Sequence, residues 1–298
     1  MAGFINDLKY NFKTGGALMQ LIYVNVGVFL AITIIRLFGF FFKTNTISAI
    51  IPWIAANSGP MEMLYKPWTA ITYMFVHESF WHILFNLILF YFSGRIFESL
   101  LNGKRLVAVY FLGGLAGFLV YFIAYNIFPV FEGAAIPILG ASASIMAILV
   151  AIATYSPNLE LRLILLGNVK LKYIAIFFVA TDILFLDQGS NVGGKLAHIG
   201  GAIFGFLYAQ QLKKGNDMAN GFYSVVNFFR DLIKPRPKMK VASSKQSKGY
   251  QTKYYESDSK SEKEKQMKID AILDKISKSG YDSLSKAEKE FLFKNSKQ

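Results

Sequence analysis

Long apolar runs alternate with short polar segments over the first 212 residues of the chain. The run at 21–42, built as a helix, would rise about 33 Å, which is enough to cross a bilayer. Two of the last three runs are short for a full crossing, so they must tilt or begin below the membrane surface. The pattern predicts an all-α membrane protein, a polytopic bundle of six transmembrane helices at 21–42, 82–101, 106–128, 140–155, 171–186 and 195–212.

The more polar segments divide the chain into four predicted parts. After residue 265, isoleucine and leucine recur at helical spacing, and Gly280 is a typical helix stop. Ser285 and Glu288 have the spacing of a capping box, which indicates another short helix. The parts are a cytoplasmic lead-in at 1–17, a six-helix membrane domain at 18–212, a basic flexible linker at 213–264 and a small helical cytoplasmic module at 265–298.

Composition supports a membrane protein and narrows its chemistry. Hydrophobic residues make up 53% of the chain, more than is usual in a soluble domain. Cysteine is absent, which excludes a disulfide framework and a thiolate zinc site. The three histidines form no H-E-x-x-H motif, so no metal is predicted.

The net charge of +13 is concentrated in the tail, where residues 213–298 hold 20 Lys or Arg against 11 Asp or Glu. Such a segment favours contact with the anionic lipid of a bilayer. Nucleic acid is not a predicted partner, because no module of aromatic and basic residues accompanies the charge. The basic residues between the spans predict that both termini are cytoplasmic.

Polar side chains occur at matching positions in three of the predicted spans. His82, Ser142 and His198 each lie within about one turn of the same-side end of a span. Asn86 lies on the same helix face as His82, one turn deeper. Because polar groups are costly in hydrocarbon, a cluster of them at one depth indicates a functional site.

Small residues flank Ser142 and His198 at the spacing of helix-packing stripes. Such stripes allow helices to approach closely in lipid, and their contact would bring the Ser142 hydroxyl within hydrogen-bond reach of His198. Plain helix packing is the alternative explanation. The stripes are Ala143, Ala147 and Ala151 in one span, and Ala197, Gly201 and Gly205 in the other.

Serine and histidine together predict a nucleophile and its base. His198 would take the proton of Ser142 and later give it to the leaving amine. The oxyanion that forms between these steps needs preorganised donors. The candidate donors are the backbone N–H of Ser142, the Asn86 amide and the His82 side chain.

The serine does not lie in the motif of a soluble hydrolase. Gly140 and Ser142 fit the first part of G-x-S-x-G, but Ser144 replaces the last glycine and no strand precedes the motif. Ser144 is an alternative nucleophile, although it points about 200° away from Ser142 around the helix. His77 has two interpretations: it orients the outer end of the site, or it is an interfacial histidine bonded to a loop.

At these residues the chain resembles the rhomboid family of intramembrane serine proteases. Order and spacing agree with the family over residues 15–212, and the tail resembles the cytoplasmic extension of some bacterial members. The matching residues are His77, His82 and Asn86 for H-x4-H-x3-N, Gly140 and Ser142 for G-x-S, Ala197, His198, Gly201 and Gly205 for A-H-x-x-G-x-x-x-G, and Glu98 for a position that braces the second span.

The resemblance implies a Ser142–His198 dyad with no catalytic aspartate, an oxyanion site made by His82, Asn86 and the Ser142 backbone, and no cofactor. It implies that the substrates are single-span transmembrane proteins, cut near the outer membrane boundary. The candidates for a lateral gate that admits them are Phe177, Phe178 and Phe185.

Two residues near the serine depart from the family's usual pattern. Ala143 replaces a common glycine and is still small enough for close packing. Met146 replaces an aromatic residue that stacks on the catalytic histidine, and its sulfur can still contact the ring. These departures support the alternative of a catalytically inactive member that binds membrane clients. A transporter is less favoured, because the sequence has no internal repeat of two halves.

The cellular location is predicted from the same features. Absent cysteine, a basic inner face and the loop pattern fit a bacterial inner (plasma) membrane, and the resemblance points the same way. We therefore expect a multi-pass integral protein of that membrane.

Overall fold

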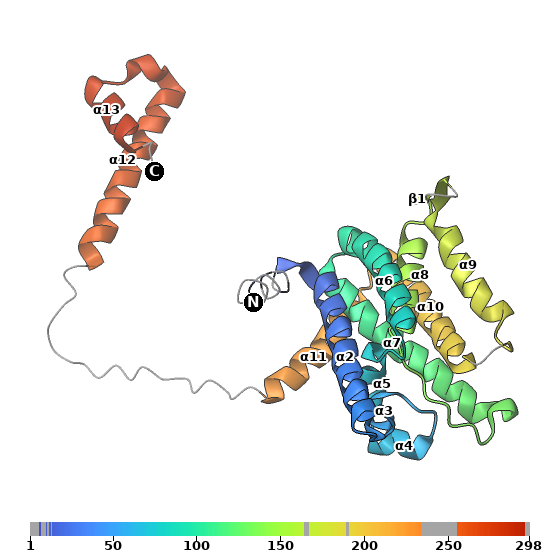
Figure 1. The fold of residues 1–298 in the computed structure, drawn as a ribbon. Helices are drawn as coiled ribbons and strands as arrows, with labels where there is room; N and C mark the ends of the chain where they lie inside the picture. The colour runs from blue at the N-terminus through green and yellow to red at the C-terminus, as the bar shows by residue number, and fades with distance from the viewer. Residues whose placement is uncertain are drawn as a thin grey trace. The chain divides into compact units, whose positions relative to one another are not determined.

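The computed structural model describes residues 14–163, 167–188, 191–233 and 255–295, together with residues 6, 10 and 12. The chain forms two compact units, Met1–Pro235 and Arg236–Gln298. Figure 1 shows that the described residues are mostly helical. The elements of the first unit are α2 (Gly16–Phe41), α3 (Thr46–Ile54), α4 (Pro60–Tyr65), α5 (Thr69–Thr72), η1 (Tyr73–Phe75), α6 (Phe80–Leu101), α7 (Gly103–Ile127), η2 (Pro129–Phe131), α8 (Ser142–Tyr155), β1 (Glu160–Leu163), β2 (Gly167–Lys170), α9 (Leu171–Leu184), α10 (Val192–Lys213) and α11 (Met218–Ile233).

A helix covers each of the six predicted spans, in α2, α6, α7, α8, α9 and α10. Within the described residues, α2, α6 and α7 are long enough and apolar enough to cross a membrane. Helix α8 is also apolar but has only 14 residues, as many as α9. The prediction of a helical membrane bundle is confirmed, and the count of six crossings stays a prediction.

Helix α8 lies at the centre of the first unit. Ten of its 14 residues are buried. It packs against α6, α7, α9 and α10, while α9 lies at the edge of the bundle (Figure 1). A side chain at the start of α8 is therefore surrounded by other helices.

The contact between α8 and α10 depends on two glycines. A Cβ atom at Gly201 would lie 2.1 Å from the carbonyl oxygen of Ala143, and one at Gly205 would lie 2.2 Å from that of Ala147. Neither distance is possible for a real side chain, so only glycine allows the two backbones to approach this closely. The predicted packing of the two small-residue stripes is confirmed.

Three structured segments were not predicted. The connection 43–76 contains α3, α4, α5 and η1, and the strands β1 and β2 pair antiparallel. The expected flexible linker at 213–264 needs correction, because it includes α11 and the start of α12, while residues 234–254 lie outside the described residues. Helix α11 forms because it has an apolar face, whose Phe222 stacks on Phe111 of α7 at 6.0 Å.

Most of the predicted lead-in at 1–17 lies outside the described residues.

The second unit contains α12 (Tyr255–Ser279), η3 (Tyr281–Ser283) and α13 (Lys286–Asn295). Gly280 ends α12 with a φ of +78°, as its predicted role as a stop requires. The capping box is also confirmed, because the Ser285 backbone N–H donates to Glu288 Oε2 at 2.7 Å and the Glu288 N–H donates to Ser285 Oγ at 3.4 Å. Hydrogen bonds from Ser285 and the Lys275 ammonium lower the pKa of Glu288 to about 2.

We predict that Gly205→Ala lowers the stability of the first unit. The new methyl group would meet the Ala147 carbonyl, which belongs to a helix backbone and cannot rotate away. Forced overpacking of this kind costs about 1–3 kcal/mol. The measurement is the thermal unfolding midpoint of the purified protein in detergent, followed by circular dichroism.

Gly27→Ala is the matched control, because Gly27 lies within membrane helix α2 and a Cβ there meets nothing within 4 Å. This change should be neutral or stabilise by up to about 1 kcal/mol, since alanine favours helix more than glycine does. If Gly205→Ala unfolded at the same temperature as Gly27→Ala, the close α8–α10 contact would be wrong.

Candidate active site

Ser142 is the first residue of α8 and follows a glycine with a special conformation. Gly140 has a φ of +117°, which a side chain would strain, and its N–H donates to the Tyr73 carbonyl at 2.9 Å. A Cβ atom at Gly140 would lie 2.8 Å from Nε2 of His82. The glycine thus turns the chain into α8 and leaves room for the His82 ring beside Ser142.

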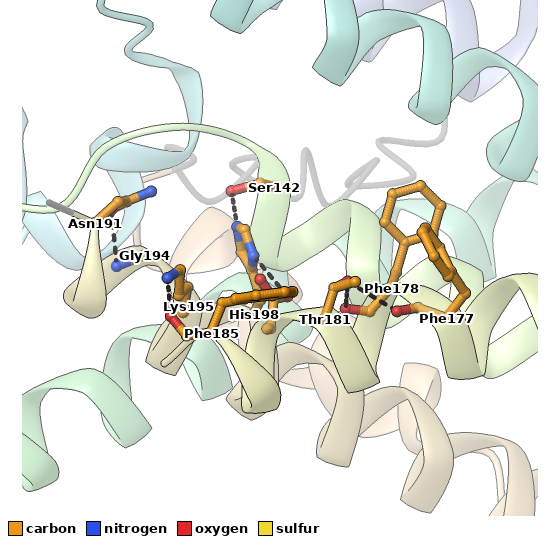
Figure 2. Close-up of polar contacts among 10 residues, drawn as sticks. Ser142, Phe177, Phe178, Thr181, Phe185, Asn191, Gly194, Lys195 and His198 are labelled. Atoms are coloured by element: carbon orange, nitrogen blue, oxygen red, sulfur yellow. Dashed lines mark hydrogen bonds and ion pairs between the residues drawn. The ribbon is translucent and has the colours of Figure 1, made fainter. Parts of the chain in front are cut away.

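Ser142 and His198 meet across the α8–α10 contact. Ser142 Oγ and His198 Nε2 are 2.6 Å apart (Figure 2). This is the hydrogen bond that the small-residue stripes predicted. An imidazole nitrogen at this distance can take the hydroxyl proton, so the geometry is that of a nucleophile and its base.

The other ring nitrogen of His198 has a partner that was not predicted. His198 Nδ1 lies 3.0 Å from Oδ2 of Asp182, which belongs to α9. The resemblance implied a dyad with no catalytic aspartate and gave no reason to expect a carboxylate here. The packing of α9 on α10 nevertheless brings one to the imidazole. The sequence carried a signal, since Asp182 is an ionisable residue within a predicted span.

His82 and Asn86 lie on one face of α6, as their spacing predicted. Asn86 is only 8% exposed, and its amide donates to the His82 carbonyl at 2.8 Å. One N–H of the Asn86 amide is used in this way, which leaves the second. The Asn86 side chain also lines the cleft that contains Ser142 and His198.

His77 is almost fully buried at 1% exposure, just before α6. Its ring meets that of His82 edge to face at 5.1 Å, and Nδ1 lies 3.3 Å from the Phe75 carbonyl. Among the residues that the structure describes, Nε2 has no hydrogen-bond partner. Burial, and secondly the neighbouring His82, lower the pKa of His77 to about 4, so this imidazole is neutral at pH 7.

A cleft of about 450 Å³ gives access to the Ser142–His198 pair. Helices α6 and α9 form its two sides, and α8 and α10 contribute Ser142, Met146 and His198. Its surface is mostly apolar. The remaining lining residues are Phe85, Asn86, Ile88, Leu89 and Phe92 of α6, and Phe178, Thr181 and Asp182 of α9.

Of the three gate candidates, one lines this cleft and two do not. Phe178 lines it, whereas Phe177 is 63% exposed and is not part of the lining. Phe185 follows the end of α9, and its carbonyl accepts from the Lys195 ammonium. Figure 2 shows Phe177 and Phe178 at one end of the close-up and Phe185 beside Lys195.

Two other predicted residues lie away from the cleft. Ser144 is fully buried and packs near Gly114 of α7, and its hydroxyl finds no hydrogen-bond partner in the described part of the chain. Glu98 accepts from the backbone N–H of Ala17 at 2.9 Å, so it connects α6 to the start of α2. Neither contributes to the cleft. Among the described residues, no group of three or more His, Asp or Glu side chains is placed to hold a metal ion.

A helical membrane bundle with a serine–histidine pair beside an apolar cleft is the architecture of an intramembrane protease. Residues 65–214 match the model of the rhomboid domain, which covers half of the chain. The chain belongs to the rhomboid family, a family of intramembrane proteases. Residues 256–298 match a second model, described as a family of unknown function (DUF6576).

Curated relatives agree with this assignment. The chain is 37% identical over 142 residues to presenilin-associated rhomboid-like protein A, mitochondrial, of Danio rerio, covering 45% of this chain and 34% of the relative. It is 31% identical over 158 residues to RHOMBOID-like protein 12, mitochondrial, of Arabidopsis thaliana, covering 49% and 47%. The human presenilin-associated rhomboid-like protein, mitochondrial, is 34% identical over 142 residues, covering 45% and 35%. The chain therefore spans about a third to a half of these relatives.

The names of the relatives also correct the expected location. The basic segments and the loop pattern predicted a bacterial inner membrane with both termini in the cytoplasm. That prediction is wrong, because the matching proteins of a fish, a plant and a mammal are all named as mitochondrial. The distribution of Lys and Arg predicts how the spans are oriented, but it does not predict which cellular membrane contains them.

We predict that the fold loses stability between pH 6.5 and pH 4 through His77. The pKa of His77 is about 4 in the folded protein and about 6.5 in an unfolded chain, so the unfolded chain binds a proton more readily in this window. The contribution of neutral His77 to the free energy of unfolding is therefore present above pH 6.5 and is lost as the pH falls toward 4. By pH 5 the loss is about 2 kcal/mol.

The measurement compares thermal unfolding midpoints in detergent at pH 7 and pH 5. His77→Gln should show a smaller decrease than the wild type, because glutamine does not titrate. Equal decreases in both proteins would show that His77 is not the group responsible.

Proposed function

We propose that this chain is an active intramembrane serine endopeptidase, with Ser142 as the nucleophile and His198 as the general base and acid. The observation that carries the proposal is the 2.6 Å contact of Ser142 Oγ with His198 Nε2, at a cleft between membrane helices. The family assignment supports the same chemistry.

The proposed reaction uses the two residues in two stages. His198 accepts the hydroxyl proton as Ser142 Oγ attacks the carbonyl carbon of the scissile peptide bond. The tetrahedral intermediate breaks its C–N bond, and His198 gives the proton to the leaving amine. Water then attacks the acyl-enzyme with His198 again as the base, which releases the new carboxylate and restores Ser142.

The negative oxygen of the intermediate requires donors near Ser142. The backbone N–H of Ser142 is one, because the first N–H groups of a helix have no partner within it, and the helix dipole favours negative charge there. Asn86 can offer the N–H that is not bonded to the His82 carbonyl. The His82 ring, which lies beside Gly140, is the third candidate donor.

The cleft also supports a substrate class. Its sides are apolar and belong to membrane helices, so an apolar segment of a membrane protein fits better than a soluble peptide. A helical amide is hidden by its own hydrogen bonds, so the segment must unwind before attack. We therefore propose single-span membrane proteins as substrates, cut near the membrane boundary on the side of Ser142.

We predict that a fluorophosphonate probe labels the detergent-solubilised wild type. Ser142→Ala and His198→Ala should each abolish labelling, because one removes the nucleophile and the other its base. Ser144→Ala is the matched control and should label like the wild type, since the Ser144 hydroxyl is buried and makes no hydrogen bond to any described residue.

The readout is gel fluorescence of the labelled band, with a thermal unfolding scan of each variant to confirm folding. Labelling that persisted in folded Ser142→Ala would refute the assignment of the nucleophile. A folded wild type that did not label would refute the activated serine and favour a client-binding role.

We further predict that Asn86→Ala slows labelling by about 10- to 1000-fold, the range expected for loss of an oxyanion donor. The rate constant is measured from a time course at saturating probe. An unchanged rate in the folded variant would remove Asn86 from this role.

A further inference from the structure

The imidazole of His198 is held from both sides. Its Nε2 meets Ser142 at 2.6 Å, and its Nδ1 meets the Asp182 carboxylate at 3.0 Å. Figure 2 shows a dashed contact on each side of the His198 ring, one of them to Ser142. The side chains of His198 and Asp182 are only 20% and 16% exposed, so water competes weakly for this contact.

The position of Asp182 selects one form of the histidine. A carboxylate only accepts hydrogen bonds, so Nδ1 must carry the proton that it donates to Asp182. Nε2 of the neutral ring is then an acceptor, which is the form needed to take the Ser142 proton. When the ring becomes charged during the reaction, the adjacent carboxylate stabilises that charge in surroundings with little water.

We propose that Asp182 is a positioning residue, which fixes the tautomer and orientation of His198 and stabilises its charged form. Ser142, His198 and Asp182 then form a catalytic triad in which Asp182 acts through His198. This inference rests on the proposed roles of Ser142 and His198. Because Asp182 lies on α9, a side of the cleft, the contact also ties the position of that helix to the orientation of the imidazole.

Neighbouring groups do not take over this role. The Lys195 ammonium binds the backbone carbonyls of Phe185 and Gln188 rather than Asp182. The hydroxyl of Thr181 donates within its own helix, to the carbonyls of Phe177 and Phe178. Within the described part of the chain, the ion-pair partner of Asp182 is His198.

Among the residues that line the cleft, the ionisable side chains are those of Asp182 and His198. Helix α8 has no acidic or basic residue, and those of α7 are Lys104 and Arg105 at its start. The ring of His82 approaches from α6, beside Gly140. A carboxylate that is largely removed from water is costly without a partner, and the imidazole supplies one.

The test compares three substitutions at Asp182 in the full-length protein in detergent. The readouts are kinact and KI for the fluorophosphonate probe. Asp182→Asn keeps the shape, but its amide can donate to Nδ1 and hold the proton on Nε2, where Ser142 needs an acceptor. We expect its kinact to fall by about 100-fold to 10⁴-fold, the upper value being the known effect of this change in a Ser-His-Asp triad, while KI stays within about threefold.

Two comparisons separate this role from a purely structural one. A contact that only pins α9 to α10 would tolerate asparagine better than alanine, whereas the proposal requires Asp182→Asn to be at least as slow as Asp182→Ala. Asp182→Glu should recover part of the rate. The matched control is Asp187→Asn, an exposed aspartate just beyond α9, which should behave like the wild type.

A second measurement does not depend on activity. The ¹⁵N resonances of labelled histidine, assigned with His198→Ala, should show the proton of neutral His198 on Nδ1 in the wild type and a shift toward Nε2 in Asp182→Asn. A wild-type kinact in Asp182→Asn, or an unchanged tautomer, would overturn the inference while leaving Ser142 and His198 in place. Failure of the wild type to label would instead refute the proposed function, and the tautomer would still decide the role of Asp182.

Discussion

The closeness of α8 and α10 determines the rest of this structure. Lipid offers no hydrophobic force between helices, so they associate through van der Waals packing and hydrogen bonds. Gly201 and Gly205 let the α10 backbone approach the carbonyls of Ala143 and Ala147, with no space for a methyl group between them. Ser142 directly precedes Ala143 on α8, and His198 lies one turn before Gly201 on α10. The close approach of the two helices therefore brings Ser142 and His198 into hydrogen-bond contact.

The polar groups around this pair share a common physical meaning. Each is partly or fully removed from water, and each must find a partner or bear a cost. Asn86 bonds to the carbonyl of His82, and Asp182 to the ring of His198, whereas His77 keeps an unpaired nitrogen and a lowered pKa. Asn86 and Asp182 line the same cleft as Ser142 and His198, and such a cluster of polar groups in a membrane bundle indicates a functional site.

The sequence predicted what depends on local periodicity. Helical spacing placed Asn86 beneath His82, and the two small-residue stripes predicted the Ser142–His198 contact. The capping box of Ser285 and Glu288 was local for the same reason. Asp182 was missed because its distance from His198 depends on how α9 packs against α10, which no spacing within one helix encodes. The antiparallel pairing of β1 with β2 and the packing of α11 on α7 also depend on contacts between elements.

The central claim is that Ser142, within the bundle, cleaves membrane proteins. The most direct measurement reconstitutes wild type and Ser142→Ala in vesicles with a mixture of single-span membrane proteins and sequences the new N-termini by mass spectrometry. The account predicts new termini close to the membrane boundary with the wild type and none with Ser142→Ala. The same set of termini from both folded proteins would contradict it.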